Sequence, residues 1–230
     1  MKKWHLSDSE RKTKDLWQLQ RINSEFTQGF DKMFDIKPGI TVFGSARFKK
    51  DNKYYKATYN ICSDLTEMGY TITTGGGPGI MEAANKAAKD NKVDSIGIGI
   101  ELPFEAGNNE YVDYDKSLSL KYFFTRKLLL TKYSQGFLCM PGGLGTLDEL
   151  AEVLTLSQTG KTQRFPIVLY DSKYWKGLLD WFKDTLLDEN ATISEKDFDL
   201  FRVVDTKEEA VKCFTDFFNK YRVNNEFNVD

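Results

Sequence analysis

A glycine-rich loop and two carboxylates stand together in residues 140–150, M-P-G-G-L-G-T-L-D-E-L. The loop follows an apolar run at 136–140 that is typical of a buried strand, and it leads into a helical pattern at 149–158. Backbone N–H groups and the helix dipole at such a strand-to-helix junction favour a bound phosphate. Asp148 and Glu149 bring carboxylates into the same turn, where they can act as general bases or stabilise positive charge. The segment therefore predicts a phosphate site beside a reactive carboxylate.

Glu149 also has a purely structural interpretation. Thr146 and Glu149 have the T-x-x-E spacing of a capping box, in which both side chains satisfy N–H groups at a helix N-terminus. Asp148 would then complement the helix dipole. The local sequence alone favours this capping interpretation of Glu149.

Strands and helices alternate along the chain and must position this segment. Apolar runs predict strands at 39–46, 70–76, 95–102, 117–123, 136–140, 165–170 and 200–205. Helical spacing predicts helices at 8–34, 54–69, 78–90, 124–134, 149–158, 174–187 and 206–221, with Pro78 near the first helical position. Apolar strands between helices indicate a parallel sheet that is covered on both faces. We expect an α/β fold: a Rossmann-like, doubly wound, mainly parallel sheet with helices on both faces.

The length of 230 residues fits one large domain. We expect an amphipathic helical segment at 1–36, a single Rossmann-like nucleotide-binding catalytic domain at 37–221 and a polar tail at 222–230. The loop 101–116 is long, polar and aperiodic, which favours a functional role.

Composition excludes several classes of function. The net charge of −2 gives no basic excess, so no nucleic-acid partner is expected. Neither a signal peptide nor an 18-residue apolar run is found, so no membrane partner is expected. The sole histidine is His5, which argues against Ser-His-Asp, Cys-His and histidine–zinc chemistry, and we expect no metal site. The three cysteines are far apart and odd in number, which favours reduced thiols in a cytoplasmic protein.

Small residues follow three predicted strands, at 44–47, 73–81 and 140–146. Ligands of doubly wound sheets bind at the carboxyl ends of the strands, so these segments are candidate binding loops. Neither the G-x-G-x-x-G pattern nor the Walker pattern is present, which disfavours NAD binding and ATP-driven phosphoryl transfer. Each glycine loop, taken alone, is equally consistent with a tight turn between a strand and a helix. The basic residues Arg47, Arg126 and Lys127 are likewise consistent with a solvated surface.

Three motifs carry a family resemblance: G-G-G-P-G-I-M-E-A-A-N at 75–85, R-K at 126–127 and P-G-G-L-G-T-L-D-E at 141–149. In this order and spacing the chain resembles the LOG family, the cytokinin riboside 5′-monophosphate phosphoribohydrolases long labelled possible lysine decarboxylases. The resemblance spans about residues 39–172 and is nearer to the broad bacterial branch than to the plant enzymes. No lysine stands in a context that marks a pyridoxal phosphate Schiff base, so the decarboxylase label gains no support.

The resemblance implies hydrolysis of a nucleoside 5′-monophosphate, AMP or an N6-substituted AMP, to the free base and ribose 5-phosphate, without a cofactor. It implies Glu149 and Arg126 as catalytic residues and a homodimer or larger homo-oligomer, with the 5′-phosphate held by the glycine loop and Thr146. The expected substrate-binding residues are Ser45, Arg47, Gly76, Gly77, Gly79, Met81, Glu82, Glu105, Asn108, Lys127, Pro141, Gly142, Gly143, Gly145 and Thr146. The alternative is a non-catalytic carrier of a nucleotide-like ligand such as molybdenum cofactor.

Overall fold

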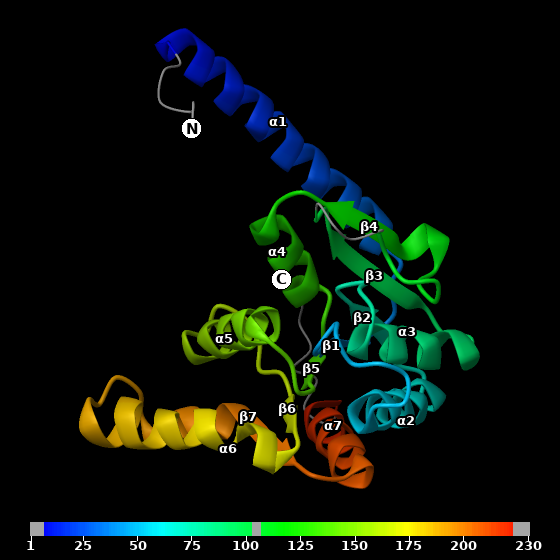
Figure 1. The fold of residues 1–230 in the computed structure, drawn as a ribbon, viewed down its shortest axis with the longest axis vertical. Helices are drawn as coiled ribbons and strands as arrows, with labels where there is room; N and C mark the ends of the chain where they lie inside the picture. Colours follow the sequence, from blue (N-terminus) through cyan, green and yellow to red (C-terminus); the bar gives the residue numbers. More distant parts are fainter. Residues whose placement is uncertain (1–6, 103–106, 223–230) are drawn as a thin grey trace.

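A seven-stranded, wholly parallel sheet forms the centre of the protein (Figure 1). The computed structural model describes residues 7–102 and 107–222. The strands lie in the order β4-β3-β2-β1-β5-β6-β7. Their bounds are β1 Gly39–Phe43, β2 Thr71–Thr74, β3 Ser95–Ile100, β4 Ser117–Leu120, β5 Gly136–Cys139, β6 Ile167–Tyr170 and β7 Phe201–Val204. The predicted doubly wound α/β fold is confirmed.

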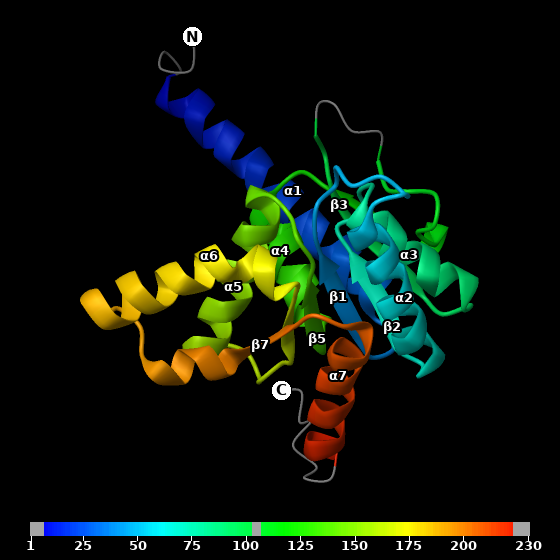
Figure 2. The same ribbon diagram turned by 60° about the horizontal axis from the view of Figure 1, so that its bottom comes forward.

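Helices connect the strands and cover both faces of the sheet (Figures 1 and 2). The α-helices are α1 Asp8–Met33, α2 Lys53–Glu67, α3 Ile80–Asp90, α4 Phe123–Lys132, α5 Leu144–Gln158, α6 Ser172–Trp181 and α7 Lys207–Arg222. Two short 3₁₀ helices, η1 (Tyr114–Lys116) and η3 (Glu195–Leu200), lie in the connections. A π-helical segment, η2 (Phe182–Glu189), continues α6. None of the helices in the described part of the chain is both long and apolar enough to cross a bilayer.

Several predicted element boundaries were wrong. Most strands end one to three residues before the predicted end, and after β1 and β2 the glycine and small residues that follow form loops. Helix α3 begins at Ile80 after the N-cap Gly79, so Pro78 precedes the helix. Helix α5 begins at Leu144, five residues before the predicted start at 149. Its first turn is therefore built from the glycine loop itself.

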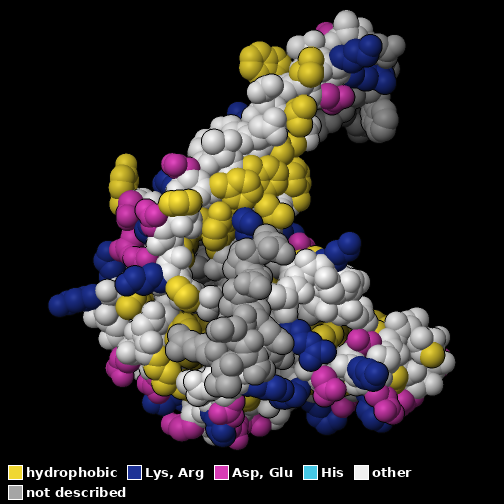
Figure 3. Space-filling model, turned by 180° about the vertical axis from the view of Figure 1, so that it is seen from behind, with side chains coloured by type: hydrophobic (Ala, Val, Ile, Leu, Met, Phe, Trp, Pro, Cys, Tyr) yellow, Lys and Arg dark blue, Asp and Glu magenta, His cyan; other side chains and the backbone are white. Residues whose placement is uncertain are grey.

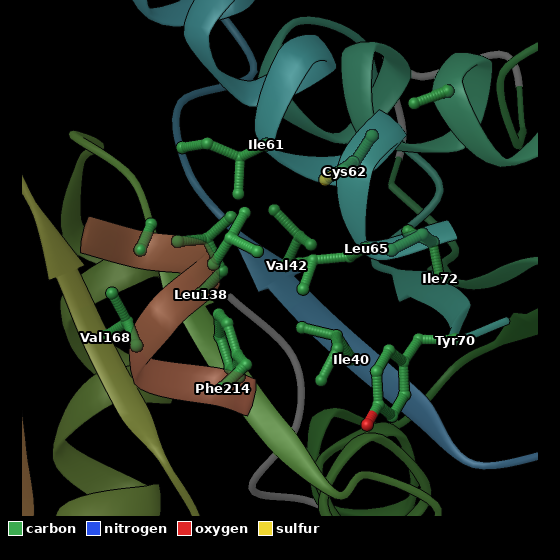
Figure 4. Packing of buried hydrophobic residues seen from close by; sticks show 14 of the residues in the cluster. Ile40, Val42, Ile61, Cys62, Leu65, Tyr70, Ile72, Leu138, Val168 and Phe214 are labelled. Atoms are coloured by element: carbon green, nitrogen blue, oxygen red, sulfur yellow. The ribbon is translucent and has the colours of Figure 1, made fainter. Parts of the chain in front are cut away.

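The core consists of two apolar layers, one on each face of the sheet. Ile40, Val42, Ile72 and Leu138 point from the strands into the first layer (Figure 4). There α2, α3 and α7 contribute Ile61, Cys62, Leu65, Ala84, Ala87 and Phe214. In the second layer, α1, α4, α5 and α6 contribute Met33, Leu129, Leu130, Leu150, Val153 and Trp175. The central strands β1 and β5 are buried at every position, which explains why their sequences are mainly apolar, whereas the edge strands β4 and β7 include exposed residues.

The strand order reverses between β1 and β5, and this reversal positions the candidate site. The chain runs outward from β1 through β2, β3 and β4, then returns to place β5 on the other side of β1. The loops after β1 and β5 are joined where the Ser45 N–H donates to the Pro141 carbonyl at 3.1 Å. A crevice at the carboxyl ends of the strands is expected at such a reversal.

Helix α1 projects from the body of the protein (Figures 1 and 2). Only its second half packs on the body, where Met33 is buried and Gly29 lies against Leu129 of α4. The Lys32 ammonium donates to the Ser117 carbonyl at 2.6 Å. Glu25 is buried and its carboxylate accepts from groups at the start of α4. The first half of α1 is exposed on all sides.

Candidate active site

A cavity of about 760 Å³ opens at the carboxyl ends of the strands. Its walls come from the loops after β1, β2, β3 and β5 and from α4, α5 and α6. The residues that line it are Phe43, Gly44, Ser45, Ala46, Arg47, Phe48, Gly75, Gly77, Met81, Ile100, Leu102, Phe123, Arg126, Gly142, Gly143, Leu144, Gly145, Thr146, Asp148, Glu149 and Tyr174. The two predicted glycine loops, the predicted arginine and the predicted carboxylate thus meet around one space.

The loop before α5 is open toward the cavity. Gly143 is the N-cap residue of α5, and no side chain caps the helix. A Cβ atom placed on Gly143 or Gly145 would meet no atom within 4 Å. The first turn of an α-helix leaves N–H groups without an intrahelical acceptor, and the helix dipole adds positive potential there. This open N-terminus is suited to an anion such as a phosphate group.

The loop before α3 is closed by packing instead. Gly79 has a φ of +70°, and a Cβ atom there would lie 2.4 Å from the Ser45 carbonyl oxygen. The Ile80 N–H at the start of α3 donates to that same carbonyl at 3.0 Å. Gly76, with a φ of +75°, lies under the side chain of Asn108. These glycines are therefore explained by the close approach of neighbouring segments rather than by an open phosphate site.

Arg126 is held at the cavity wall by this closed loop. Its Nε donates to the Ile98 carbonyl at 2.9 Å. A Cβ atom on Gly75 would lie 2.0 Å from its Nη2 atom, so only glycine leaves room for the guanidinium. The 75–79 loop thus contributes indirectly, because it gives space to a cation that lines the cavity.

The capping interpretation of Glu149 is wrong. With Gly143 as the N-cap, Thr146 is the third residue of α5 and Glu149 the sixth, so their side chains do not form a capping box. The Glu149 side chain is only 8% exposed, and the residue lines the cavity. Glu149 is therefore a largely buried carboxylate that lines the cavity one turn beyond the open N-terminus of α5.

Glu149 is ion-paired with Lys127 of α4. The Lys127 ammonium lies 3.3 Å from Glu149 Oε2, 2.9 Å from Asp148 Oδ2 and 3.1 Å from Glu152 Oε2. Burial raises the pKa of Glu149, and the charges of Lys127 and Arg126 oppose this rise. Burial opposes ionisation of Lys127, yet the hydrogen bond to Asp148 and the charges of Glu149 and Glu152 outweigh it and raise the pKa of Lys127.

The structure brings most predicted site residues together at the cavity. Those that line it are Ser45, Arg47, Gly77, Met81, Arg126, Gly142, Gly143, Gly145, Thr146 and Glu149. Six other predicted residues are not among the lining residues: Gly76, Gly79, Glu82, Asn108, Lys127 and Pro141. Glu82 instead pairs with Lys50 at 3.0 Å and accepts from the Tyr55 hydroxyl at 3.1 Å. Glu105 lies outside the described residues.

Sequence reasoning missed Tyr174 and every residue of the apolar wall except Met81. Met81, Ile100, Leu102 and Phe123 form an apolar part of the lining. Tyr174 lies in the first turn of α6, just after β6, which neighbours β5 in the sheet. The strand order was the missing signal, because it places the end of β6 beside the 140–146 loop.

The described residues show neither a cluster of metal ligands nor a lysine in the cavity lining. Within residues 7–102 and 107–222, no group of three or more His, Cys, Asp or Glu side chains is arranged to hold a metal ion. The described residues that line the cavity include no lysine, the residue that pyridoxal phosphate needs for its Schiff base. A pyridoxal phosphate site therefore does not fit this cavity.

A family model described as possible lysine decarboxylase matches residues 81–214, more than half of the chain. The chain belongs to this family, the LOG family. A relative from Mycobacterium marinum, named cytokinin riboside 5′-monophosphate phosphoribohydrolase, is 27% identical over 65% of this chain and 79% of its own length. A relative of the same name from Arabidopsis thaliana is 28% identical over 77% of this chain and 82% of its own.

Solved structures show the same LOG fold. A structural genomics target aligns with a TM-score of 0.56 at 21% identity, covering 78% of this chain and 99% of that chain. The molybdenum cofactor binding protein from the phototrophic bacterium Rippkaea orientalis aligns with a TM-score of 0.55 at 19% identity, covering 80% of this chain and 99% of that one. At such identities the similarity establishes the fold alone.

Proposed function

We propose that this LOG protein hydrolyses the N-glycosidic bond of a nucleoside 5′-monophosphate, AMP or an N6-substituted AMP, to the free base and ribose 5-phosphate. The observation that carries the proposal is the buried carboxylate of Glu149, which shares one cavity with the open N-terminus of α5. The names of the relatives support the same reaction class.

The 5′-phosphate would bind at the N-terminus of α5, with Gly143, Gly145 and Thr146 around it. Glu149 lies one turn further along α5 than Gly145. A ligand held by its phosphate would therefore present its ribose to the carboxylate. Binding energy from the phosphate can in this way position the reacting carbon, which lies at the other end of the same sugar.

Cleavage of the N-glycosidic bond develops positive charge on the ribose, as in glycoside hydrolysis. The ionised Glu149 stabilises this charge and accepts a proton from water as the water oxygen bonds to C1′. The electron pair of the broken bond leaves with the base, which takes up a proton. Arg126 supports the leaving base or the ribose hydroxyls, and the apolar wall of Met81, Ile100, Leu102 and Phe123 accommodates the base.

The decisive experiment incubates the protein with a panel of nucleoside 5′-monophosphates and separates the free bases by chromatography. We expect base release from AMP or an N6-substituted AMP without added metal or cofactor, and far slower release from adenosine, which lacks the phosphate. Glu149→Gln should lower turnover by about 100-fold or more while AMP still binds. Equal turnover of AMP and adenosine would refute the phosphate anchor.

The alternative function is a carrier that binds a nucleotide-like ligand without converting it. The presence of both Glu149 and Arg126 at the cavity favours the hydrolase. Tight binding of AMP by calorimetry, with no base released from any nucleotide in the panel, would favour the carrier.

We also propose that the protein is a homodimer or a larger homo-oligomer. Apolar side chains are exposed on α1 (Leu16, Trp17, Leu19 and Phe30) and on α4 (Phe123, Phe124 and Leu128). Figure 3 shows apolar side chains gathered along the projecting helix and at its base. Exposed patches of this kind commonly mark interfaces. A monomer mass by light scattering at micromolar concentration would contradict this proposal.

We also propose a cytoplasmic location, which the three free cysteines support.

A further inference from the structure

Lys127 lies beside Glu149 but is not among the residues that line the cavity. Its side chain is only 13% exposed, and its ammonium is within 3.3 Å of oxygen atoms from Asp148, Glu149 and Glu152. It also lies 3.3 Å from the Asp148 carbonyl oxygen. An ammonium group has three N–H donors, so these carboxylates can occupy all of them. This arrangement directs Lys127 toward the protein rather than toward a ligand.

The surroundings of Glu149 would otherwise oppose its ionisation. Asp148 and Glu152 on α5 add negative charge, and the buried thiol of Cys139 on β5 adds none. Arg126 on α4 is a second cation whose charge acts on Glu149, and Arg47 and Tyr174 line the same cavity. Without Lys127, three neighbouring carboxylates would lack the cation that joins them. Like charges in one site disfavour the ionised form of each carboxyl group.

We propose that Lys127 is a positioning residue that favours the ionised form of Glu149 and holds its carboxylate in place for hydrolysis. This inference rests on the proposed function, because an ionised Glu149 matters there as a base and as a stabiliser of positive charge. The ion pair engages Oε2 of Glu149, which leaves Oε1 as the oxygen that accepts the proton of water. Lys127 thus acts on the reaction only through Glu149.

The first test measures kcat/KM against pH for the wild-type protein, Lys127→Gln and Lys132→Gln. Lys132 is an exposed lysine on the same helix, so its substitution is a matched control. In Lys127→Gln the acid limb of the profile should shift to higher pH by about one to three pH units, which is the usual size of the effect when an adjacent opposite charge is lost. Activity should recover at high pH and KM should change little. Lys132→Gln should keep the wild-type profile.

Other profiles would overturn the inference. A uniform loss of activity at every pH would indicate a structural role for Lys127. A raised KM with an unmoved acid limb would indicate that Lys127 contacts the substrate, as the family resemblance implied. Lys127→Arg restores the positive charge, so it should return the acid limb toward its wild-type position.

A second measurement tests the role of Lys127 without using catalytic activity as the readout. The protein is labelled with ¹³C at the glutamate carboxyl carbon, and the Glu149 signal is assigned as the one lost in Glu149→Gln. Its titration midpoint should rise in Lys127→Gln and stay unchanged in Lys132→Gln. An unmoved midpoint would refute the role of Lys127 even if the protein hydrolyses AMP. Conversely, a wild-type protein that releases no base would refute the proposed function while this titration still decides the role of Lys127.

Discussion

The hydroxyl group of Tyr174 and the backbone of Gly142 are hydrogen-bonded to each other across 32 residues of sequence. The Gly142 N–H donates to the hydroxyl oxygen at 3.3 Å, and the hydroxyl donates to the Gly142 carbonyl. Asp171 caps α6 by accepting from the Tyr174 N–H at 3.0 Å, and its own φ is +77°. The start of α6 is thereby tied to the loop that we propose for phosphate binding.

Tyr174→Phe should weaken substrate binding, because the loop loses this tie. One hydrogen bond contributes about 0.5–1.5 kcal/mol, so KM for the nucleotide should rise about two- to tenfold, with kcat little changed. Steady-state kinetics measure both values. Tyr114→Phe is the control, because Tyr114 is 95% exposed and lies outside the cavity lining. A lowered kcat at constant KM would show that Tyr174 acts in the chemical step instead.

Gly145→Ala and Gly79→Ala should have opposite effects, because only one of the two glycine loops is open. A Cβ atom at position 145 meets nothing in the protein, so this variant should fold normally but bind nucleoside monophosphates poorly. At position 79 a Cβ atom would clash with the Ser45 carbonyl, and φ is positive, so Gly79→Ala should unfold at a lower temperature. Thermal unfolding with and without AMP distinguishes the two. Weak AMP binding by a stably folded Gly79→Ala variant would instead assign the phosphate to the 75–79 loop.

Glu149→Gln should become more stable relative to the wild-type protein as pH rises. Burial raises the pKa of Glu149 above its ordinary value of 4.5, so between the two values the folded state holds a proton that the unfolded state has lost. The wild-type protein therefore loses stability as pH rises through the raised pKa, whereas glutamine does not titrate. Lys127 stays charged throughout, because its pKa is raised.

The measurement is the melting temperature of both proteins from about pH 4.5 to about pH 7.5. The melting temperature of Glu149→Gln minus that of the wild-type protein should become more positive as pH rises across this range. A constant difference would mean that Glu149 titrates alike in the folded and unfolded chain.

Glu25→Ala should destabilise the protein, although Glu25 does not line the cavity. The Glu25 carboxylate accepts from the Lys121 N–H at 2.8 Å and from the Thr125 hydroxyl at 2.6 Å. Hydrogen bonds to a charged group contribute about 1.5–3 kcal/mol, so the free energy of unfolding should fall by about that amount, although the Thr125 hydroxyl can still donate to the Tyr122 carbonyl. Urea denaturation measures this loss. The exposed carboxylate of Asp15 on the same helix is the control, and Asp15→Ala should leave the unfolding midpoint where it is.

The sequence predicted the fold well because burial on both faces leaves a strong pattern. Strands such as β1 and β5 are mainly apolar and buried at every position, and amphipathic helices separate the strands. The boundaries of the helices and strands were predicted less accurately. Helix α5 begins inside the glycine loop, where backbone hydrogen bonding overrides the low helix propensity of Gly145. The capping interpretation of Glu149 failed because α5 begins before Thr146, so Thr146 lies inside the helix rather than at its N-cap.

The site was predicted less completely than the fold, for a physical reason. Motifs identified the residues of the open loop, Arg126 and Glu149, because glycine and charge are visible in a sequence. Whether a glycine is open, as at 143, or packed, as at 79, depends on segments that lie far away in the chain. Tyr174 and Phe123 are ordinary aromatic residues, and only the strand order brings them to the cavity.

The docking of α1 on α4 has a consequence for how the chain is made. The groups that Glu25 binds lie 96 and 100 residues later in the sequence, and the acceptor for Lys32 lies 85 residues later. At a synthesis rate of roughly 5–20 residues per second, the first helix leaves the ribosome roughly 5–20 s before its partner exists. During that interval its apolar side chains have no native surface to cover them. We therefore expect α1 to be made well before the groups that it docks on and to reach its final place only after them.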